Sequence, residues 1–105
     1  MKKIGVAACA ALLMVSGVTS TAAGPLQRGC LQSDRPGATR SMCGCIQAVA
    51  DGMLKRGDQR KAARFFRDPH SAQEIRTSRS QRDKRFWQEY RAFGDRVEQV
   101  CSAYR

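Results

Sequence analysis

Two cysteines stand two positions apart in the stretch SMCGCIQAVADGML, residues 41–54. The apolar residues around them recur at helical spacing, which predicts an amphipathic helix. Side chains two residues apart on a helix point about 200° away from each other, so Cys43 and Cys45 cannot share one partner. A bond between the two would close a small, strained ring. Each of these cysteines is therefore expected to pair with a different, distant cysteine.

The first 23 residues have the pattern of a secretory signal peptide. Lys2 and Lys3 precede an apolar run over residues 4–15, and small residues then place a cleavage site after Ala23. The apolar run is too short to span a bilayer. Almost no hydrophobic stretch precedes Cys9, which argues against a lipid-attachment site there. We therefore expect a periplasmic or secreted protein.

Cleavage would remove Cys9 and leave one small, basic domain. Of the 105 residues, 82 would remain, and the formal net charge would fall from +10 to +8. A chain of this length buries only about 60–65% of its unfolded surface. Small exported domains often compensate with disulfides, and four cysteines, an even number, would be left to form them.

The helical faces predict how these four cysteines pair. Cys45 lies on the apolar stripe and is expected to bond Cys101 through the core, whereas Cys43 faces the incoming chain and is expected to bond Cys30. The alternative is the swapped pairing, Cys43 with Cys101 and Cys45 with Cys30. On the loop-entropy model the two predicted bonds contribute roughly 4 and 3 kcal/mol, so loss of Cys45–Cys101 is expected to destabilise the protein more.

Two other interpretations of the CGC pair have less support from the sequence. A thiol at a helix N-terminus can be reactive, which would suit a redox protein but would leave Cys30 and Cys101 to pair alone. A metal site lacks the usual paired ligands, because His70 is the only histidine in the chain. Structural disulfides are therefore the preferred interpretation.

The rest of the chain predicts helices and no strands. Residues 24–41, rich in Gly, Pro, Ser and Arg, are expected to form an irregular N-terminal arm, and residues 42–105 a helical domain. Within that domain we expect helices over about residues 42–55, 59–67, 69–76 and 81–102. The predicted fold class is all-α, a small disulfide-stapled bundle of three to four helices.

Several residues predict where these helices begin and end. Gly57 is expected to end the first helix, and Asp58 to cap the second. Asp68 and Pro69 suit the start of the third helix. Ser80, with an acidic residue three positions on, suits the start of the last.

Apolar stripes predict which faces are buried. On the first helix the stripe is Met42, Cys45, Ile46, Val49 and Met53; on the last it is Phe86, Tyr90, Phe93, Val97, Val100 and Cys101, with Trp87 on its flank. Because the aromatic residues follow helical spacing, we expect them to form the core rather than to stack on nucleic acid bases.

Four pieces of the chain resemble a known group. The pieces MCGCIQAVAD, DQRKAARFFRDPHSAQEIRTS, RFWQEYRAFGD and Cys101 are similar to small exported alphaproteobacterial proteins of the Rhodobacterales type, which often carry the label "arginine transporter". The likeness covers about Cys30 to Cys101. It implies at most an accessory, solute-binding role in arginine uptake, because 82 residues cannot build an alternating-access carrier. The many arginine side chains are also positively charged, and a guanidinium ligand needs negatively charged or aromatic partners.

Positive charge gathers in residues 76–85, where it predicts an anion-binding surface made of Arg76, Arg79, Arg82, Lys84 and Arg85. Only Asp83 offsets these charges within that segment, and a helix start adds N–H donors that favour anions. Candidate anions are lipid headgroups, envelope polysaccharide, phosphate or an acidic protein. As a comparison for merely diffuse charge, the chain offers Arg56, Arg60 and Arg64.

No catalytic, phosphate-loop or zinc motif occurs in the chain, so we expect a non-enzymatic protein without a cofactor. The predicted function is a binding or interaction module for an anionic envelope component or for another exported protein. The alternatives are an accessory protein for arginine uptake and a thiol redox protein using the CGC pair. The compartment and the missing recognition motifs disfavour nucleic acid as a partner.

Overall fold

The computed structural model describes residues 23–105, and this range folds into helices joined by short connections. The helices are α1 (Pro25–Gln32), α2 (Arg40–Met53), α3 (Arg56–Arg67), α4 (Pro69–Arg76) and α5 (Gln81–Cys101), with a 3-10 turn at Ser102–Tyr104. No strand occurs in residues 23–105, so the predicted all-α class is confirmed. The predicted signal peptide lies, except for Ala23, outside the described residues.

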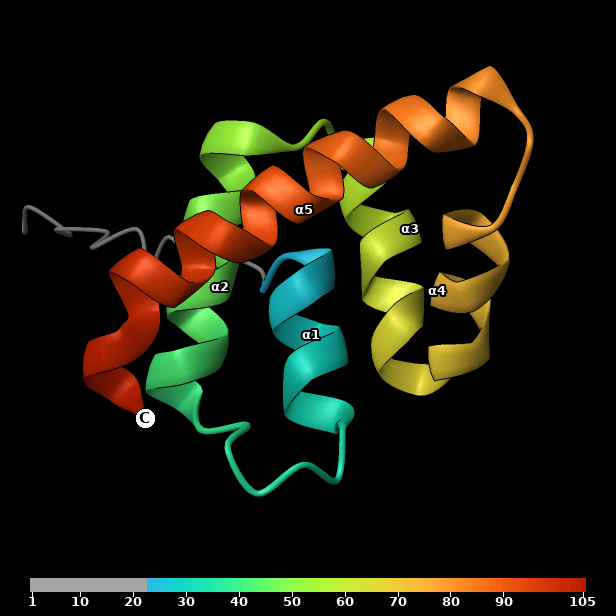
Figure 1. Cartoon of the computed structure of the whole chain (residues 1–105). Coiled ribbons are helices and arrows are strands. Elements are labelled where there is room, and N and C mark those ends of the chain that lie inside the picture. The colour runs from blue at the N-terminus through green and yellow to red at the C-terminus, as the bar shows by residue number, and fades with distance from the viewer. Residues whose placement is uncertain (1–22) are drawn as a thin grey trace, which may run out of the picture.

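Helix α1 lies between α2 and α3, and α4 packs beside α3 (Figure 1). Helix α5, the longest, crosses over the others and contacts α2 and α4. The space between these helices is filled by a core of Leu26, Ala50, Leu54, Ala62, Ala63, Phe65, Phe86 and Phe93. Every helix except α4 contributes a buried residue to this core.

The predicted irregular arm is wrong for residues 25–32, which form α1. An eight-residue helix containing a glycine would be marginal on its own. Tertiary contacts hold it: Leu26 is 1% exposed in the core, Cys30 is bonded to α2, and Gln47 accepts hydrogen bonds from its first turn. Pro25 at the first helical position costs nothing, since its missing N–H would be unpaired there anyway.

The boundary between α2 and α3 also differs from the prediction. Helix α2 ends at Met53, Leu54 takes an extended conformation, and α3 begins directly after Lys55. Burial of Leu54 in the core turns the chain here. Gly57 therefore lies inside α3 rather than ending α2, and Asp58 lies in the first turn of α3, where a negative charge suits the helix dipole, rather than at the cap.

The other predicted helix starts are confirmed. The Asp68 carboxylate accepts a hydrogen bond from the N–H of His70 at the start of α4, at 3.2 Å. The Ser80 hydroxyl accepts one from the N–H of Asp83 at the start of α5, at 3.4 Å. Helix α2 has an additional cap in Thr39 that the sequence analysis does not predict.

The predicted apolar face of α2 is only partly right, because α2 packs against α1 on one side and α5 on another. The buried residues of α2 are Cys43, Gln47 and Ala50, whereas most of the predicted stripe is half-buried. Met53 is exposed, as is Val100 near the end of α5. A single stripe could not anticipate a helix that is covered from two directions.

The aromatic residues form the predicted core. Tyr90 lies at the centre of the cluster, with ring centroids 5.1 Å from Phe65, 5.4 Å from Trp87, 6.0 Å from Phe86 and 6.1 Å from Phe93. Burial among these rings raises the pKa of the Tyr90 hydroxyl, because a phenolate would be poorly solvated there. The aromatic rings are therefore used for packing between α3 and α5.

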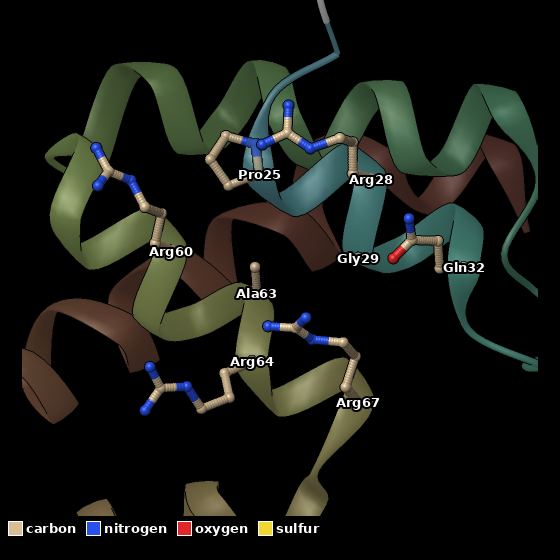
Figure 2. A pocket seen from close by; sticks show the side chains of 8 residues that line it. All are labelled: Pro25, Arg28, Gly29, Gln32, Arg60, Ala63, Arg64 and Arg67. Carbon is tan, nitrogen blue, oxygen red and sulfur yellow. The ribbon is translucent and has the colours of Figure 1, made fainter.

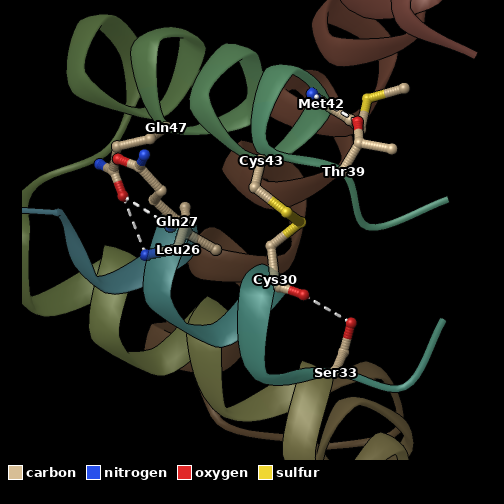
Figure 3. Close-up of a disulfide and its surroundings, with 8 residues drawn as sticks. All are labelled: Leu26, Gln27, Cys30, Ser33, Thr39, Met42, Cys43 and Gln47. Carbon is tan, nitrogen blue, oxygen red and sulfur yellow. Dashed lines mark hydrogen bonds between the residues drawn. A yellow bond between two sulfur atoms is a disulfide. The ribbon is translucent and has the colours of Figure 1, made fainter. Parts of the chain in front are cut away.

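Two disulfides, Cys30–Cys43 and Cys45–Cys101, match the predicted pairing, with Cα–Cα distances of 5.5 and 5.8 Å. The first joins α1 to the start of α2 (Figure 3). The second joins α2 to the end of α5. As expected, Cys45–Cys101 ties the two longest helices, and Cys101 is buried; Cys45 is half-buried, however, whereas Cys30 and Cys43 are both buried, so Cys30–Cys43 is the more deeply buried bond.

Candidate anion-binding groove

The cationic segment predicted to bind anions lies at the junction of α4 and α5. Arg76 ends α4, Arg79 lies in the connection that follows, and the remaining three residues lie in the first turns of α5. All five are exposed. Arg82 and Arg85 line a cavity of about 180 Å³ together with residues of α3 and the α2–α3 connection, but Arg76, Arg79 and Lys84 do not.

Acidic side chains lie near part of this charge. Asp58 and Glu89 line the same cavity as Arg82. Asp83 lies 3.3 Å from the ammonium of Lys61. Hydrogen bonds from Ser78 and then from Lys61 lower the pKa of the Asp83 carboxyl, because both stabilise its charged form. Lys55 and Lys61 line this cavity as well, so the two arginines of the segment that reach it lie among both cations and carboxylates.

A second cationic site, which the sequence analysis does not predict, lies between α1 and α3. It is a groove of about 410 Å³ (Figure 2). Four arginines line it: Arg28 comes from α1, and Arg60, Arg64 and Arg67 come from α3. Its other lining residues are Pro25, Gly29, Gln32 and Ala63. We call this site the arginine groove.

The spacing of the α3 arginines puts them along one side of that helix. Positions 60, 64 and 67 follow the i, i+4, i+7 pattern, and their Cα atoms span about 10 Å along the helix axis. Arg64 and Arg67 also lie in the last turn of α3, where cations interact favourably with the helix dipole. The helix dipole accounts for two of the four charges but not for Arg28 or Arg60.

Small residues let α1 and α3 approach closely at the base of the arginine groove. A Cβ atom at Gly29 would lie 3.2 Å from the carbonyl oxygen of Ala63 and 3.3 Å from the ring of Phe66. These contacts would be tight, so glycine at position 29 allows the present distance between the two helices. Close approach brings the single arginine of α1 to the same groove as the three of α3.

The charge of the arginine groove is uncompensated within the part of the chain that the structure describes. No acidic residue lines it. The salt bridges in residues 23–105 are Lys61–Asp83, His70–Glu74 and Arg105–Glu98, none of which involves a groove arginine. One groove arginine has a protein acceptor, since Arg28 donates to the carbonyl oxygen of Ala23. Four cations thus line one groove without a carboxylate.

A buried glutamine fixes the position of α1 and therefore one wall of the groove. Gln47 of α2 accepts hydrogen bonds from the N–H groups of Leu26 and Gln27, at 2.9 and 3.0 Å (Figure 3). Its amide nitrogen donates to Asp51 and to Gln59, both at 2.8 Å. Gln47 is thus a helix cap supplied by another helix. Nothing in the local sequence distinguishes it from an exposed polar residue.

The remaining candidate side chains lie outside this groove. His70 makes an exposed i, i+4 contact with Glu74 at 3.4 Å, as a surface residue would. In residues 23–105, no three His, Cys, Asp or Glu side chains cluster closely enough to hold a metal ion. None of the helices formed by these residues is long and apolar enough to cross a membrane.

Comparison with known proteins adds no assignment, because no protein-family model, curated protein or solved structure matches the chain. The arginine groove therefore stands on its geometry and charge alone.

Proposed function

We propose that this chain is a small, exported, non-enzymatic protein that binds an anionic partner in the periplasm or cell envelope, and that the arginine groove is the binding site. The observation that carries the proposal is that four arginines, and no acidic residue, line one groove. Like charges held close together destabilise a protein, so an unpaired cluster is best explained by a ligand that neutralises it.

Two disulfides support the exported part of the proposal, because such bonds persist in oxidising compartments. The signal-peptide pattern of residues 1–23 points the same way. All four cysteines in the described range are bonded, which supports a structural role for the CGC pair over a thiol redox role.

The chemistry of the groove favours an anion over arginine, the solute suggested by the resemblance. A guanidinium ligand is held by carboxylates and aromatic faces. The arginine groove instead presents four guanidinium groups and the amide of Gln32. These groups donate hydrogen bonds to negatively charged oxygens, and arginine forks bind phosphate and carboxylate in a bidentate manner.

The test measures binding of the oxidised protein to heparin and to anionic liposomes over a series of salt concentrations. Binding should weaken steeply with salt, as multi-charge contacts do. Two triple variants with the same loss of charge are compared: Arg28, Arg60 and Arg67 changed to glutamine, and Arg79, Arg82 and Arg85 changed to glutamine. The groove variant should bind about tenfold more weakly than the segment variant.

Far-UV circular dichroism of both variants verifies that their helices are intact. An equal loss in the two variants would mean that only the net charge matters, and the arginine groove would be abandoned as the site. A larger loss in the segment variant would return the site to residues 76–85. No binding by the unaltered protein to either anionic surface would reject the proposed function.

A further inference from the structure

We infer that the arginine groove accepts two phosphate groups carried on one small scaffold, an inference that rests on the anion-binding function proposed above. The proposed function requires only negative charge. The number, spacing and type of the cationic groups in the groove specify the ligand further.

The charge of the lining sets the charge of the ligand. Four guanidinium groups line the groove, and arginine stays protonated at all physiological pH values. A phosphate monoester carries a charge of about −1.5 to −2 at pH 7. Two such groups therefore match the four cations, whereas one leaves about half of the charge uncompensated.

The spacing of the arginines separates them into more than one binding position. The α3 arginines start from Cα atoms spread over about 10 Å, and Arg28 adds a fourth position on α1. Charge-assisted N–H···O bonds are only about 2.7–2.9 Å long, so four guanidinium groups on a single phosphate would be forced against one another. Two phosphates divide the four arginines into pairs and place an anion between the cations of each pair.

The type of donor favours phosphate over carboxylate. Each guanidinium presents a planar fork of N–H donors and no acceptor. A carboxylate has two oxygens and is used up by one fork, whereas the three oxygens of a phosphate can accept from two arginines. Two phosphates can thus engage all four forks, and the Gln32 amide remains for the scaffold that joins them.

The size of the groove leaves room for such a scaffold. Its volume of about 410 Å³ falls within the roughly 300–1,000 Å³ usual for small-ligand sites. The base is made of Gly29, Ala63 and Pro25, so no large side chain occupies the space between the arginines. A phosphorylated sugar, free in solution or as the headgroup of a lipid, has this chemistry.

The experiment compares ligands that differ by one phosphate. In the soluble arm, calorimetry at low salt measures fructose 1,6-bisphosphate against fructose 6-phosphate, with citrate as a multivalent carboxylate. In the membrane arm, vesicles containing diphosphoryl lipid A are compared with vesicles containing monophosphoryl lipid A. Where the headgroup is the source, the preference for two phosphates appears in the vesicles; where a soluble ligand is the source, calorimetry alone shows it.

The expected result is one ligand per protein and binding of the two-phosphate ligand at least about tenfold tighter than its one-phosphate partner or citrate, in at least one arm. Changing Arg60 and Arg67 to lysine should keep the charge but remove this preference, because lysine lacks the fork. The same change at Arg79 and Arg91, two exposed residues outside the groove, should leave the preference intact.

The outcomes separate the two proposals. Salt-sensitive binding to heparin through the groove, with no preference for two phosphates in either arm, would overturn this inference and leave the proposed function standing. A preference that survives the Arg60 and Arg67 lysine changes would also overturn it. If no anion, heparin included, binds in a way that depends on the arginine groove, both the proposed function and this inference are rejected.

Discussion

Replacing Gln47 by leucine would test how the short helix α1, and with it one wall of the arginine groove, is held in place. Gln47 is 6% exposed and makes four hydrogen bonds, two accepted from α1 and two donated to Asp51 and Gln59. Leucine has a similar size, so the change mainly removes these hydrogen bonds and leaves their partners in place.

The expected cost comes from the partners that water cannot reach. The buried N–H of Leu26 would lose its acceptor and the buried Oε1 of Gln59 would lose a donor, and each unpaired buried group costs about 1–3 kcal/mol. The N–H of Gln27 is only partly buried, and Asp51 is exposed, so water can replace most of what they lose. The sum is about 3 kcal/mol, a large fraction of the stability of a small domain.

Urea unfolding of the oxidised protein, followed by circular dichroism, measures this loss. Leucine at the exposed Gln88 of α5 is the matched control, and should change the free energy of unfolding by less than about 0.5 kcal/mol. A loss below about 1 kcal/mol for Gln47→Leu would refute the reasoning. It would mean that α1 is held by Leu26 and the disulfide and that its first turn is satisfied by water.

A second change at the same position separates capping from charge. Gln47→Glu keeps an acceptor for the N–H groups of Leu26 and Gln27, and a negative charge suits a helix N-terminus. It also brings a carboxylate against Asp51, whose oxygen lies 2.8 Å from the present amide nitrogen. This variant should be more stable at pH 5 than at pH 7, because a proton shared between the carboxylates removes their repulsion. Equal stability at both pH values would contradict the observed proximity.

Four further outcomes are expected. Hydrogen bonds lower the pKa of the Asp83 carboxyl, so the stability that this carboxylate contributes should be present above about pH 4 and be lost as the pH falls below that value. The urea midpoint of Asp83→Asn should therefore fall less in acid than that of the unaltered protein. Gly29→Val should destabilise by about 1–3 kcal/mol by forcing α1 from α3, whereas Gly29→Ala should be nearly neutral, since tight contact offsets its higher helix propensity. Arg60→Gln should raise the free energy of unfolding by about 0.5 kcal/mol at low salt, by removing repulsion between like charges one turn apart; a loss would show that this arginine is already neutralised. Because Cys45 is half-buried whereas Cys30 and Cys43 are both buried, mild reductant should open Cys45–Cys101 before Cys30–Cys43, and peptide mapping after brief thiol treatment checks the order.

Local sequence was sufficient for the elements whose signals are local. The caps at Asp68 and Ser80 use side chains within three residues of the backbone groups they satisfy, so they can be read from spacing alone. The aromatic stripe of α5 repeats at helical spacing over a long helix, and its core role follows. That Cys43 and Cys45 bond different partners was also accessible, because the two face different directions on one helix, and the helix faces favoured the pairing that the structure has over the swapped one.

Helix α1 and the arginine groove were decided by tertiary structure. Residues 25–32 carry a proline, a glycine and few apolar side chains, so their intrinsic preference for helix is weak. What makes them helical is a glutamine 20 residues away, a disulfide, and burial of Leu26. The groove depends in turn on that helix, since Arg28 meets the arginines of α3 only once α1 is in place.

Charge shows the same division most clearly. The sequence by itself determined a basic helical domain with two disulfides. Composition fixes the net charge, and residue spacing fixes the helix faces and the directions of the cysteine side chains. It could not determine where the charge is unopposed. Residues 76–85 are dense in cations along the chain, yet the two of them that line a cavity lie there beside Asp58 and Glu89, while Arg28 and Arg60 are far apart in sequence and share one groove without a carboxylate. Coulomb interactions depend on distance in the folded protein, and only the packing of α1 against α3 sets that distance.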